Sequence, residues 1–360
     1  MKKLLVIFIG LLSLHVNAQV QDSTVSQDFL KKLDSLGGID SAANAQMKYN
    51  LGVELMDSKM YEKAISYFDS ATLYDSHFVL AYFNKGICHM KLGALGVAKN
   101  DFAVLITKDS NYHLAYFKLG EVYSLEGYSQ MAIDSYSKAI SKFNKAPKYF
   151  YNRGVVYFQQ NDYENAQNDF TTTISLKGDH AYAYNDRGST FLKQDNLDAA
   201  IKDFHKAVEF NPALSFSYNN LGTAYRKKEN FNESIKAYNE AIKIDPDYFV
   251  ALNNRGMAKF GKEDYEAAIN DFDRCLKLNG NYSFAINNKA SCYIGLEDWD
   301  QAISFANKAI ELNSDYTYAY YNRAIAKEMK RDLAGACEDW KKASELGLEA
   351  ARTYYNSTCK

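Results

Sequence analysis

Proline is nearly absent from this chain, with only three among 360 residues, while glycine is present at an ordinary level and cysteine occurs five times. This composition excludes a collagen-like chain, a disordered chain and a small scaffold stapled by disulfides. Hydrophobic residues make up 47% of the sequence and aromatic residues 14%, which is ample for a packed core. Together these values favour a helical protein.

Concentrated positive charge is also missing. The formal net charge is −2, and no cluster of lysine and arginine stands out. Binding to nucleic acid requires a basic surface that neutralises phosphates. We therefore expect no nucleic-acid partner.

The motifs of catalysis and metal binding are absent as well. The sequence contains no glycine-rich phosphate loop, no HExxH, no nucleophile elbow and no CxxC pair. No two histidines after residue 18 pair at helical spacing, and the acidic residues form no isolated pair suited to acid–base chemistry. We therefore expect no catalytic residues, no enzymatic activity, no cofactor and no bound metal.

Residues 1–18 have the pattern of a bacterial secretory signal peptide. Two lysines precede the apolar run Leu4–Leu14, and Val16 with Ala18 fits the rule for cleavage after Ala18. The run is too short to span a bilayer well, and no cysteine follows it that could carry a lipid. We expect a protein exported to the periplasm or exterior of a bacterium, without stable membrane insertion. An uncleaved membrane anchor is the alternative.

The dominant feature of the sequence is an internal period of 34 residues. Small residues recur at this spacing without an insertion, at Gly52, Gly86, Gly120, Gly154, Gly188, Gly222, Gly256, Ala290 and Ala324. When repeats are counted from Ala45, nine of them fill residues 45–350, and these small residues occupy repeat position 8. The spacing predicts nine copies of one structural unit.

Other columns of the repeat predict two helices in each unit. Position 20 is alanine or serine in every repeat, and position 24 is aromatic in every repeat except the eighth, which has Ala306. Positions 4, 8 and 11 fall on one face of a first helix, and positions 20, 24 and 27 fall on one face of a second. Small residues let the two helices approach closely, while the aromatic rings fill the space beside them.

This pattern resembles the tetratricopeptide repeat. The resemblance implies an all-α fold, in which antiparallel helix pairs stack into a right-handed superhelical solenoid with a long inner groove. Two departures are visible: the closing proline is present only as Pro212 and Pro246, and Ala306 predicts looser or shifted packing in repeat 8.

Positions 7 and 23 carry opposite charges where the helical pattern places the flank of the core. The pairs are Lys85 with Asp101, Arg153 with Asp169, Arg187 with Asp203, Arg255 with Asp271, and Arg323 with Asp339. An acid is present at position 23 only in repeats that carry a base at position 7. Lys289 is the single base without an acid, since position 23 of its repeat is Phe305. We predict a salt bridge between the two helices of these five repeats. The alternative is that both positions are solvated, since exposed pairs contribute little to stability.

A candidate binding surface lies on the side of the first helices that lines the groove in this family. Position 6 is asparagine in seven repeats, and the candidate groove residues at this position are Asn84, Asn152, Asn220, Asn254, Asn288 and Asn322. An amide both donates and accepts hydrogen bonds, so a ladder of amides could bind the backbone of an extended peptide without reading its sequence. Alternatively, each amide bonds to the neighbouring helix.

Positions 2 and 5 add apolar surface, at Phe83, Phe117, Tyr151, Tyr182, Phe216, Phe284 and Tyr321. Aromatic anchors on a rigid wall favour partner binding, although some of these rings could instead pack between adjacent first helices. Bases on this side, such as Lys118, Lys148 and Arg226, do not cluster, so we do not expect the terminal-carboxylate clamp of heat-shock co-chaperones in this family.

The predicted function is that of a non-enzymatic exported scaffold, which binds a protein or peptide segment in the groove. The alternative is a structural or assembly subunit of a cell-envelope complex, which would use the convex surface or the ends of the solenoid. The sequence leaves the identity of the partner and the oligomeric state open.

The segments outside the repeats and the cysteines give four further expectations. Residues 19–44 form a polar lead-in with one possible short helix, and residues 351–360 form a tail that caps the open end of the last repeat. A disulfide between Cys337 and Cys359 would fasten this tail, because an exported protein can form disulfides. Cys275 and Cys292 are a second candidate pair; otherwise they act as small core residues.

Overall fold

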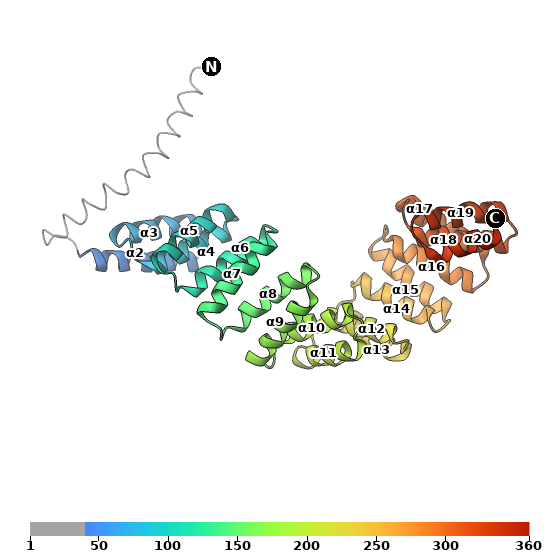
Figure 1. The fold of residues 1–360 in the computed structure, drawn as a ribbon, viewed down its shortest axis with the longest axis horizontal. Helices are drawn as coiled ribbons and strands as arrows, with labels where there is room; N and C mark the ends of the chain where they lie inside the picture. The colour runs from blue at the N-terminus through green and yellow to red at the C-terminus, as the bar shows by residue number, and fades with distance from the viewer. Residues whose placement is uncertain (1–39, 360) are drawn as a thin grey trace, which may run out of the picture. The chain divides into compact units, whose positions relative to one another are not determined.

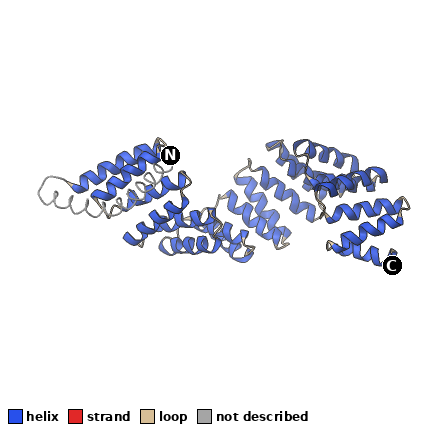
Figure 2. Cartoon of the chain, turned by 90° about the horizontal axis from the view of Figure 1, so that it is seen from above, coloured by secondary structure: helices blue, strands red, loops and turns tan. Residues whose placement is uncertain are grey.

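The computed structural model describes residues 40–359, and the regular elements in this range are all α-helices (Figures 1 and 2). The expected signal peptide and most of the lead-in lie outside the described residues. The first helices of the repeats are α2 (Ser41–Asp57), α4 (Val79–Lys91), α6 (His113–Leu125), α8 (Pro147–Gln159), α10 (Ala181–Lys193), α12 (Ser215–Lys227), α14 (Phe249–Phe260), α16 (Ser283–Gly295) and α18 (Thr317–Met329).

The second helices are α3 (Tyr61–Tyr74), α5 (Leu95–Lys108), α7 (Ser129–Lys142), α9 (Tyr163–Leu176), α11 (Leu197–Phe210), α13 (Phe231–Ile244), α15 (Tyr265–Leu278), α17 (Trp299–Leu312) and α19 (Leu333–Glu345). One further helix, α20 (Glu349–Thr358), follows the last pair. The prediction of an all-α repeat fold is confirmed.

The chain divides into two compact units, one ending at Thr172 and the other beginning at Thr173, with α9 lying across the division. Within unit 1, α3 contacts both α2 of its own repeat and α4 of the next. Within unit 2, α11 contacts α10 and α12 in the same way, and the first helices α10, α12, α14, α16 and α18 contact one another in sequence. Within each unit, a repeat is therefore packed mainly against its neighbours, as in other solenoids.

The turn between the two helices of each repeat requires a left-handed residue at position 15. The backbone φ angle there lies between 58° and 81° in all nine repeats, and glycine occupies the position only as Gly93 and Gly127. An asparagine or aspartate then caps the second helix in several repeats: Asn196 accepts a hydrogen bond from the backbone of Ala199, and Asp264 accepts one from Ala267. These local signals fix where each helix ends and the next begins.

The core of each hairpin is formed by the aromatic ring at position 24, which lies against the small residue at position 8. A Cβ atom placed on Gly256 would lie 2.6 Å from the Phe272 ring, and one on Gly222 would lie 2.7 Å from Tyr238. Both rings are fully buried. The missing Cβ is therefore what allows the second helix to approach the first closely enough to enclose the ring.

Repeat 8 has the shifted packing that its sequence predicts. Ala306 is fully buried at the aromatic position, while the neighbouring Phe305 is only half-buried and stacks on Tyr293 with ring centroids 5.4 Å apart. The ring has moved by one residue, to the flank of the core.

Helix α20 covers the exposed end of the last hairpin. Tyr354 of α20 stacks on the buried Trp340, with ring centroids 5.4 Å apart, and also contacts Tyr321. A disulfide joins Cys337 of α19 to Cys359, directly after α20, with their Cα atoms 5.7 Å apart. The apolar face that an open solenoid end would expose is thus covered by the chain itself.

Among the helices of residues 40–359, none combines the length and the apolar character needed to cross a membrane.

The contact between positions 8 and 24 predicts the effect of adding one methyl group. Gly256→Ala should lower the free energy of unfolding by about 1–3 kcal/mol, because the new Cβ overpacks against the Phe272 ring. Gly280→Ala is the matched control, since a Cβ there would meet only a backbone oxygen at 3.8 Å. Urea unfolding followed by circular dichroism measures both. Equal stability of the two variants would show that the glycine is not required for close approach.

Candidate functional site: the inner faces of the first helices

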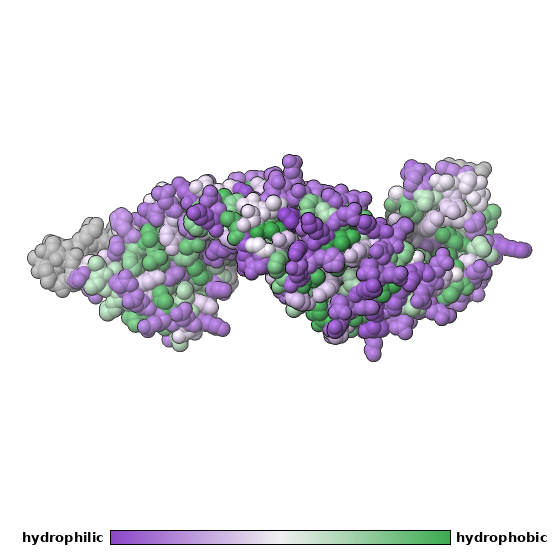
Figure 3. All heavy atoms as spheres, turned by 90° about the horizontal axis from the view of Figure 1, so that it is seen from below, coloured by the Kyte–Doolittle hydropathy of each residue, from purple (hydrophilic) through white to green (hydrophobic). Residues whose placement is uncertain are grey.

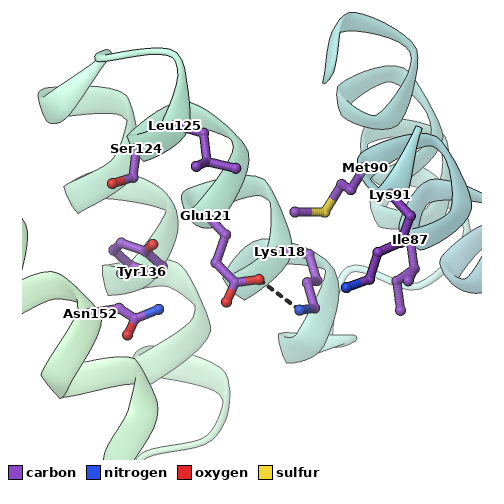
Figure 4. Close-up of a pocket in the computed structure, with 9 residues that line it drawn as sticks. All are labelled: Ile87, Met90, Lys91, Lys118, Glu121, Ser124, Leu125, Tyr136 and Asn152. Atoms are coloured by element: carbon purple, nitrogen blue, oxygen red, sulfur yellow. Dashed lines mark hydrogen bonds and ion pairs between the residues drawn. The ribbon is translucent and has the colours of Figure 1, made fainter. Parts of the chain in front are cut away.

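In unit 1, the first helices α4, α6 and α8 line a pocket of about 490 Å³ (Figure 4). The lining residues are Ile87, Met90, Lys91, Lys118, Glu121, Ser124, Leu125 and Asn152, with Tyr136 from α7. The first eight occupy repeat positions 6, 9, 12 and 13. Helical periodicity adds positions 2 and 5 to the same side. We call the surface formed by these six positions of the first helices the inner face.

The pocket combines apolar walls with an ion pair whose two charges neutralise each other. Leu125 and Met90 supply apolar surface, and the Leu125 side chain is 69% exposed. Lys118 donates a hydrogen bond to Glu121 at 2.7 Å (Figure 4). Burial raises the pKa of Tyr136, which keeps its phenol protonated, and this hydroxyl interacts with the side chain of Asn152. Such a site can hold an apolar side chain while polar groups bind the backbone beside it.

The aromatic residues at position 5 of unit 1 are partly or fully used inside the fold. Phe117 is only 2% exposed and stacks on Tyr149 with ring centroids 4.6 Å apart, so its assignment to the groove is wrong. Phe83 is half-buried between Phe102 and Tyr112, and Tyr151 packs against Phe170. These rings match the alternative interpretation, in which they pack against neighbouring helices. The hairpin pattern alone does not reveal Tyr149, because it lies on the next repeat.

In unit 2, position 5 instead carries four buried asparagines, Asn185, Asn219, Asn253 and Asn287. Each accepts a hydrogen bond from the position-6 amide of the next repeat: Asn220 donates to Asn185 at 3.2 Å, Asn254 to Asn219 at 3.0 Å, Asn288 to Asn253 at 2.9 Å, and Asn322 to Asn287 at 2.9 Å. The amide column therefore joins neighbouring first helices. The sequence contained a signal for it, since four consecutive repeats carry asparagine at positions 5 and 6 or at position 5 alone.

This geometry limits what the amides can offer a ligand. Asn322 is only 8% exposed and also donates to Ser291, so it cannot serve the groove as predicted. Asn220, Asn254 and Asn288 are half-buried. Because an amide has two N–H donors and an oxygen that accepts twice, one interhelical bond leaves each of them further hydrogen-bonding capacity. In unit 1, Asn84 donates to the hydroxyl of Tyr49 at 3.0 Å and Asn152 lines the pocket.

The exposed aromatic residues of the inner face lie at position 2 in unit 2. Tyr182 is 47% exposed, Phe284 52% and Tyr318 55%, while Phe216 is half-buried and its ring centroid lies 5.9 Å from that of Tyr182. Tyr321 is different, because it contacts Tyr354 of α20 and belongs to the C-terminal cap. Figure 3 shows hydrophobic residues gathered in separate patches on one side of the molecule, between hydrophilic residues.

The structure brings together all five predicted charge pairs. Arg153, Arg187, Arg255 and Arg323 each make two hydrogen bonds to Asp169, Asp203, Asp271 and Asp339, with distances between 2.5 and 2.9 Å, and Lys85 lies 3.1 Å from Asp101. The five aspartates are buried. Burial raises the pKa of Asp169, and the hydrogen bonds from Arg153 oppose that change. The alternative of two solvated positions does not describe these pairs.

The base at position 7 also reaches the preceding repeat. Arg255 donates to Asn239 at 2.7 Å, and Arg323 donates to Asn307 at 2.6 Å. The same contact explains the exception in repeat 8, where Lys289 donates to Asp273 of repeat 7 at 2.6 Å and lies over the Phe305 ring, 4.1 Å from its centroid. A carboxylate and an aromatic ring thus replace the acid that this repeat lacks.

The remaining cysteines carry no visible chemistry. Cys88, Cys275 and Cys292 are free and buried, so the second candidate disulfide is not formed. Burial raises the pKa of Cys88 and Cys275 to about 11 and that of Cys292 to about 12, which keeps these thiols protonated and unreactive at neutral pH. Across residues 40–359, no group of three histidine, cysteine or acidic side chains is placed to hold a metal ion.

Two models described as tetratricopeptide repeat match more than half of the chain, at residues 45–78, 113–141, 147–180, 181–214, 215–248, 249–282 and 285–316. The chain belongs to the tetratricopeptide repeat family. Residues 79–112 and 317–350 are not matched, but they form the hairpins α4–α5 and α18–α19 of the same fold.

Solved structures show the same fold at low sequence identity. A tetratricopeptide repeat protein from Parabacteroides merdae is 19% identical, with a TM-score of 0.54, over 69% of this chain and 98% of that one. The C-terminal part of a repeat-containing protein from Cytophaga hutchinsonii is 20% identical, with a TM-score of 0.52, over 66% and 98%. PilF of Pseudomonas aeruginosa is 16% identical, with a TM-score of 0.52, over 59% and 96%. A search of curated proteins returned no significant match.

The buried charge pairs predict a measurable coupling energy. In a double-mutant cycle with Arg187→Met and Asp203→Asn, the pair should show about 1–3 kcal/mol of coupling, because either partner alone leaves a buried charge or acceptor unsatisfied. The exposed pair of Lys228 and Asp198 is the control and should couple by less than about 1 kcal/mol. Urea unfolding gives both values. A coupling near zero for the first pair would contradict a structural role.

Proposed function

We propose that this chain is a non-enzymatic scaffold that binds a segment of another protein along the inner faces of its first helices. Tetratricopeptide repeat proteins typically bind protein partners and act as scaffolds, and this general role follows from family membership. The proposal adds the surface and the kind of partner.

The observation that carries the proposal is the exposure of large aromatic side chains on the inner face of unit 2. Tyr182, Phe284 and Tyr318 are about half exposed, although aromatic residues of this size are usually buried. They stand on helices that the amide ladder holds in register, so little entropy would be lost when a partner covers them. In unit 1, the inner face contains the pocket of about 490 Å³, which gives one apolar side chain a place to insert.

We also propose that the protein is exported and acts in the bacterial envelope or outside the cell. The signal-peptide pattern of residues 1–18 supports this location. The disulfide between Cys337 and Cys359 supports it independently, because such bonds persist in oxidising compartments and are rare in the cytosol. A structural role in an envelope assembly that uses the outer surface is the competing function, and the first experiment below separates the two.

Removing the exposed rings should abolish partner binding. The double variant Tyr182→Ser and Phe284→Ser should lose the proteins that copurify with the wild-type chain from its native cells, because truncating an aromatic hot-spot residue costs about 2 kcal/mol or more of binding energy. Leu278→Ser with Leu312→Ser is the matched control, since these side chains are 44% and 45% exposed and end the second helices α15 and α17. Quantitative mass spectrometry reads out both. If the control loses its partners and the first variant keeps them, binding uses the second helices and not the inner face.

Export makes a separate prediction about the covalent state of the chain. Protein isolated from native cells under thiol-blocking conditions should begin at Gln19, contain the Cys337–Cys359 bridge and show three free thiols after denaturation. Intact-mass analysis and peptide mapping measure all three features. A chain that begins at Met1 with five free thiols would place the protein in a reducing compartment and overturn the proposed location.

A further inference from the structure

One arginine on the inner face of unit 2 has no acidic partner. The arginines at position 7 are all paired with buried aspartates, whereas Arg226, on α12, forms no ion pair within residues 40–359. Its Nε atom is buried and has no hydrogen-bond partner. Arg226 occupies repeat position 12, the position at which Met90 and Ser124 line the pocket of unit 1, so it belongs to the inner face.

The surroundings of Arg226 correspond to those of the unit 1 pocket. Repeats 3 and 6 are the two that carry tyrosine at position 24, as Tyr136 and Tyr238. Tyr136 lines the pocket, and the hydroxyl of Tyr238 lies 3.1 Å from that of Thr223 and interacts with Arg226. In repeat 3 the inner face carries both Lys118 and Glu121, which neutralise each other.

Repeat 6 has no such neutralising group. Its inner face carries Asn220 at position 6 and Thr223 at position 9, where repeat 3 has Lys118 and Glu121. None of the residues at the six inner-face positions of α12, α14 and α16 is acidic.

The neighbouring charges do not supply a partner either. Asp195 is already paired with Lys227, at 3.0 Å. Asp186, the acid at the inner-face positions of α10, accepts a hydrogen bond from Asn185. A half-buried guanidinium without a carboxylate is unfavourable. Because Nε is buried, the donors that match a ligand carboxylate in two parallel bonds are the two Nη groups. The missing charge is therefore one that a bound ligand can provide.

We infer that the inner face of unit 2 binds an extended peptide segment that contains an aspartate or glutamate, whose side-chain carboxylate pairs with Arg226. This inference rests on the proposed function and specifies its partner. The half-buried amides of Asn220 and Asn254 lie on the same face and offer hydrogen bonds to the peptide backbone. The exposed rings at position 2 lie on the same side of the first helices and add apolar surface to it.

The test is a selection of random peptides on the whole protein. One library displays twelve-residue peptides inside a carrier loop, so that no terminal carboxylate is available, and a second displays them with a free C-terminus. We expect the wild-type chain to enrich peptides with aspartate or glutamate at one fixed position of the loop library. Arg226→Gln should lose that enrichment, whereas Arg274→Gln, which changes an exposed arginine of α15, should retain it.

A selected peptide then allows a titration. Changing its acidic residue to the matching amide should weaken binding to the wild-type chain roughly tenfold or more, and should change binding to Arg226→Gln by less than about threefold. Arg226→Lys keeps the charge and should keep part of the acidic preference. Thermal melting of each variant reveals any loss of folding caused by the missing contact to Tyr238.

Three results would overturn the inference. The first is an equal acidic preference of Arg226→Gln and the wild-type chain. The second is acidic enrichment only in the library with a free C-terminus, which would assign Arg226 to a terminal carboxylate. The third is the absence of any enriched peptide, and in that case the copurification experiment decides separately whether the inner face binds folded partners.

Discussion

The architecture depends on the close contact between the small residue at position 8 and the aromatic ring at position 24. Because glycine lacks a Cβ, the two helices of a hairpin approach until the ring is fully enclosed, as Phe272 is against Gly256. The buried alanine at position 20 allows the same approach from the second helix. This packing buries one side of each first helix. The opposite side, the inner face, is left for contacts with neighbouring repeats and with a partner.

Polar interactions then set how successive repeats meet. The base at position 7 binds an aspartate of its own repeat and a polar residue of the preceding one, as Arg255 does with Asp271 and Asn239. On the inner face of unit 2, the amides of positions 5 and 6 link each first helix to the next. Buried polar contacts of this kind require defined geometry, and they hold the inner-face side chains in fixed relative positions.

The sequence predicted the fold because one period controls every hairpin. It also predicted the charge pairs, since acid and base vary together across nine internal copies. It failed for Phe117 because that ring is buried by Tyr149, a residue of the next repeat that the hairpin pattern does not bring into view. The asparagine ladder was identified, but its hydrogen bonds to position 5 depend on the distance between first helices, which no single repeat encodes. In the sequence, Arg226 is only one of several scattered bases, because its lack of an acidic partner becomes apparent once the neighbouring side chains are placed.

Binding along the inner face is the central claim, and site-specific photo-crosslinking in native cells tests it most directly. A photoreactive phenylalanine would replace Tyr182, Phe216 or Phe284 on the inner face, or Leu278 or Leu312 at the ends of second helices. The account predicts that the three inner-face positions crosslink to a common partner and that the two positions at the ends of second helices do not. Crosslinks formed only from positions 278 and 312 would contradict it.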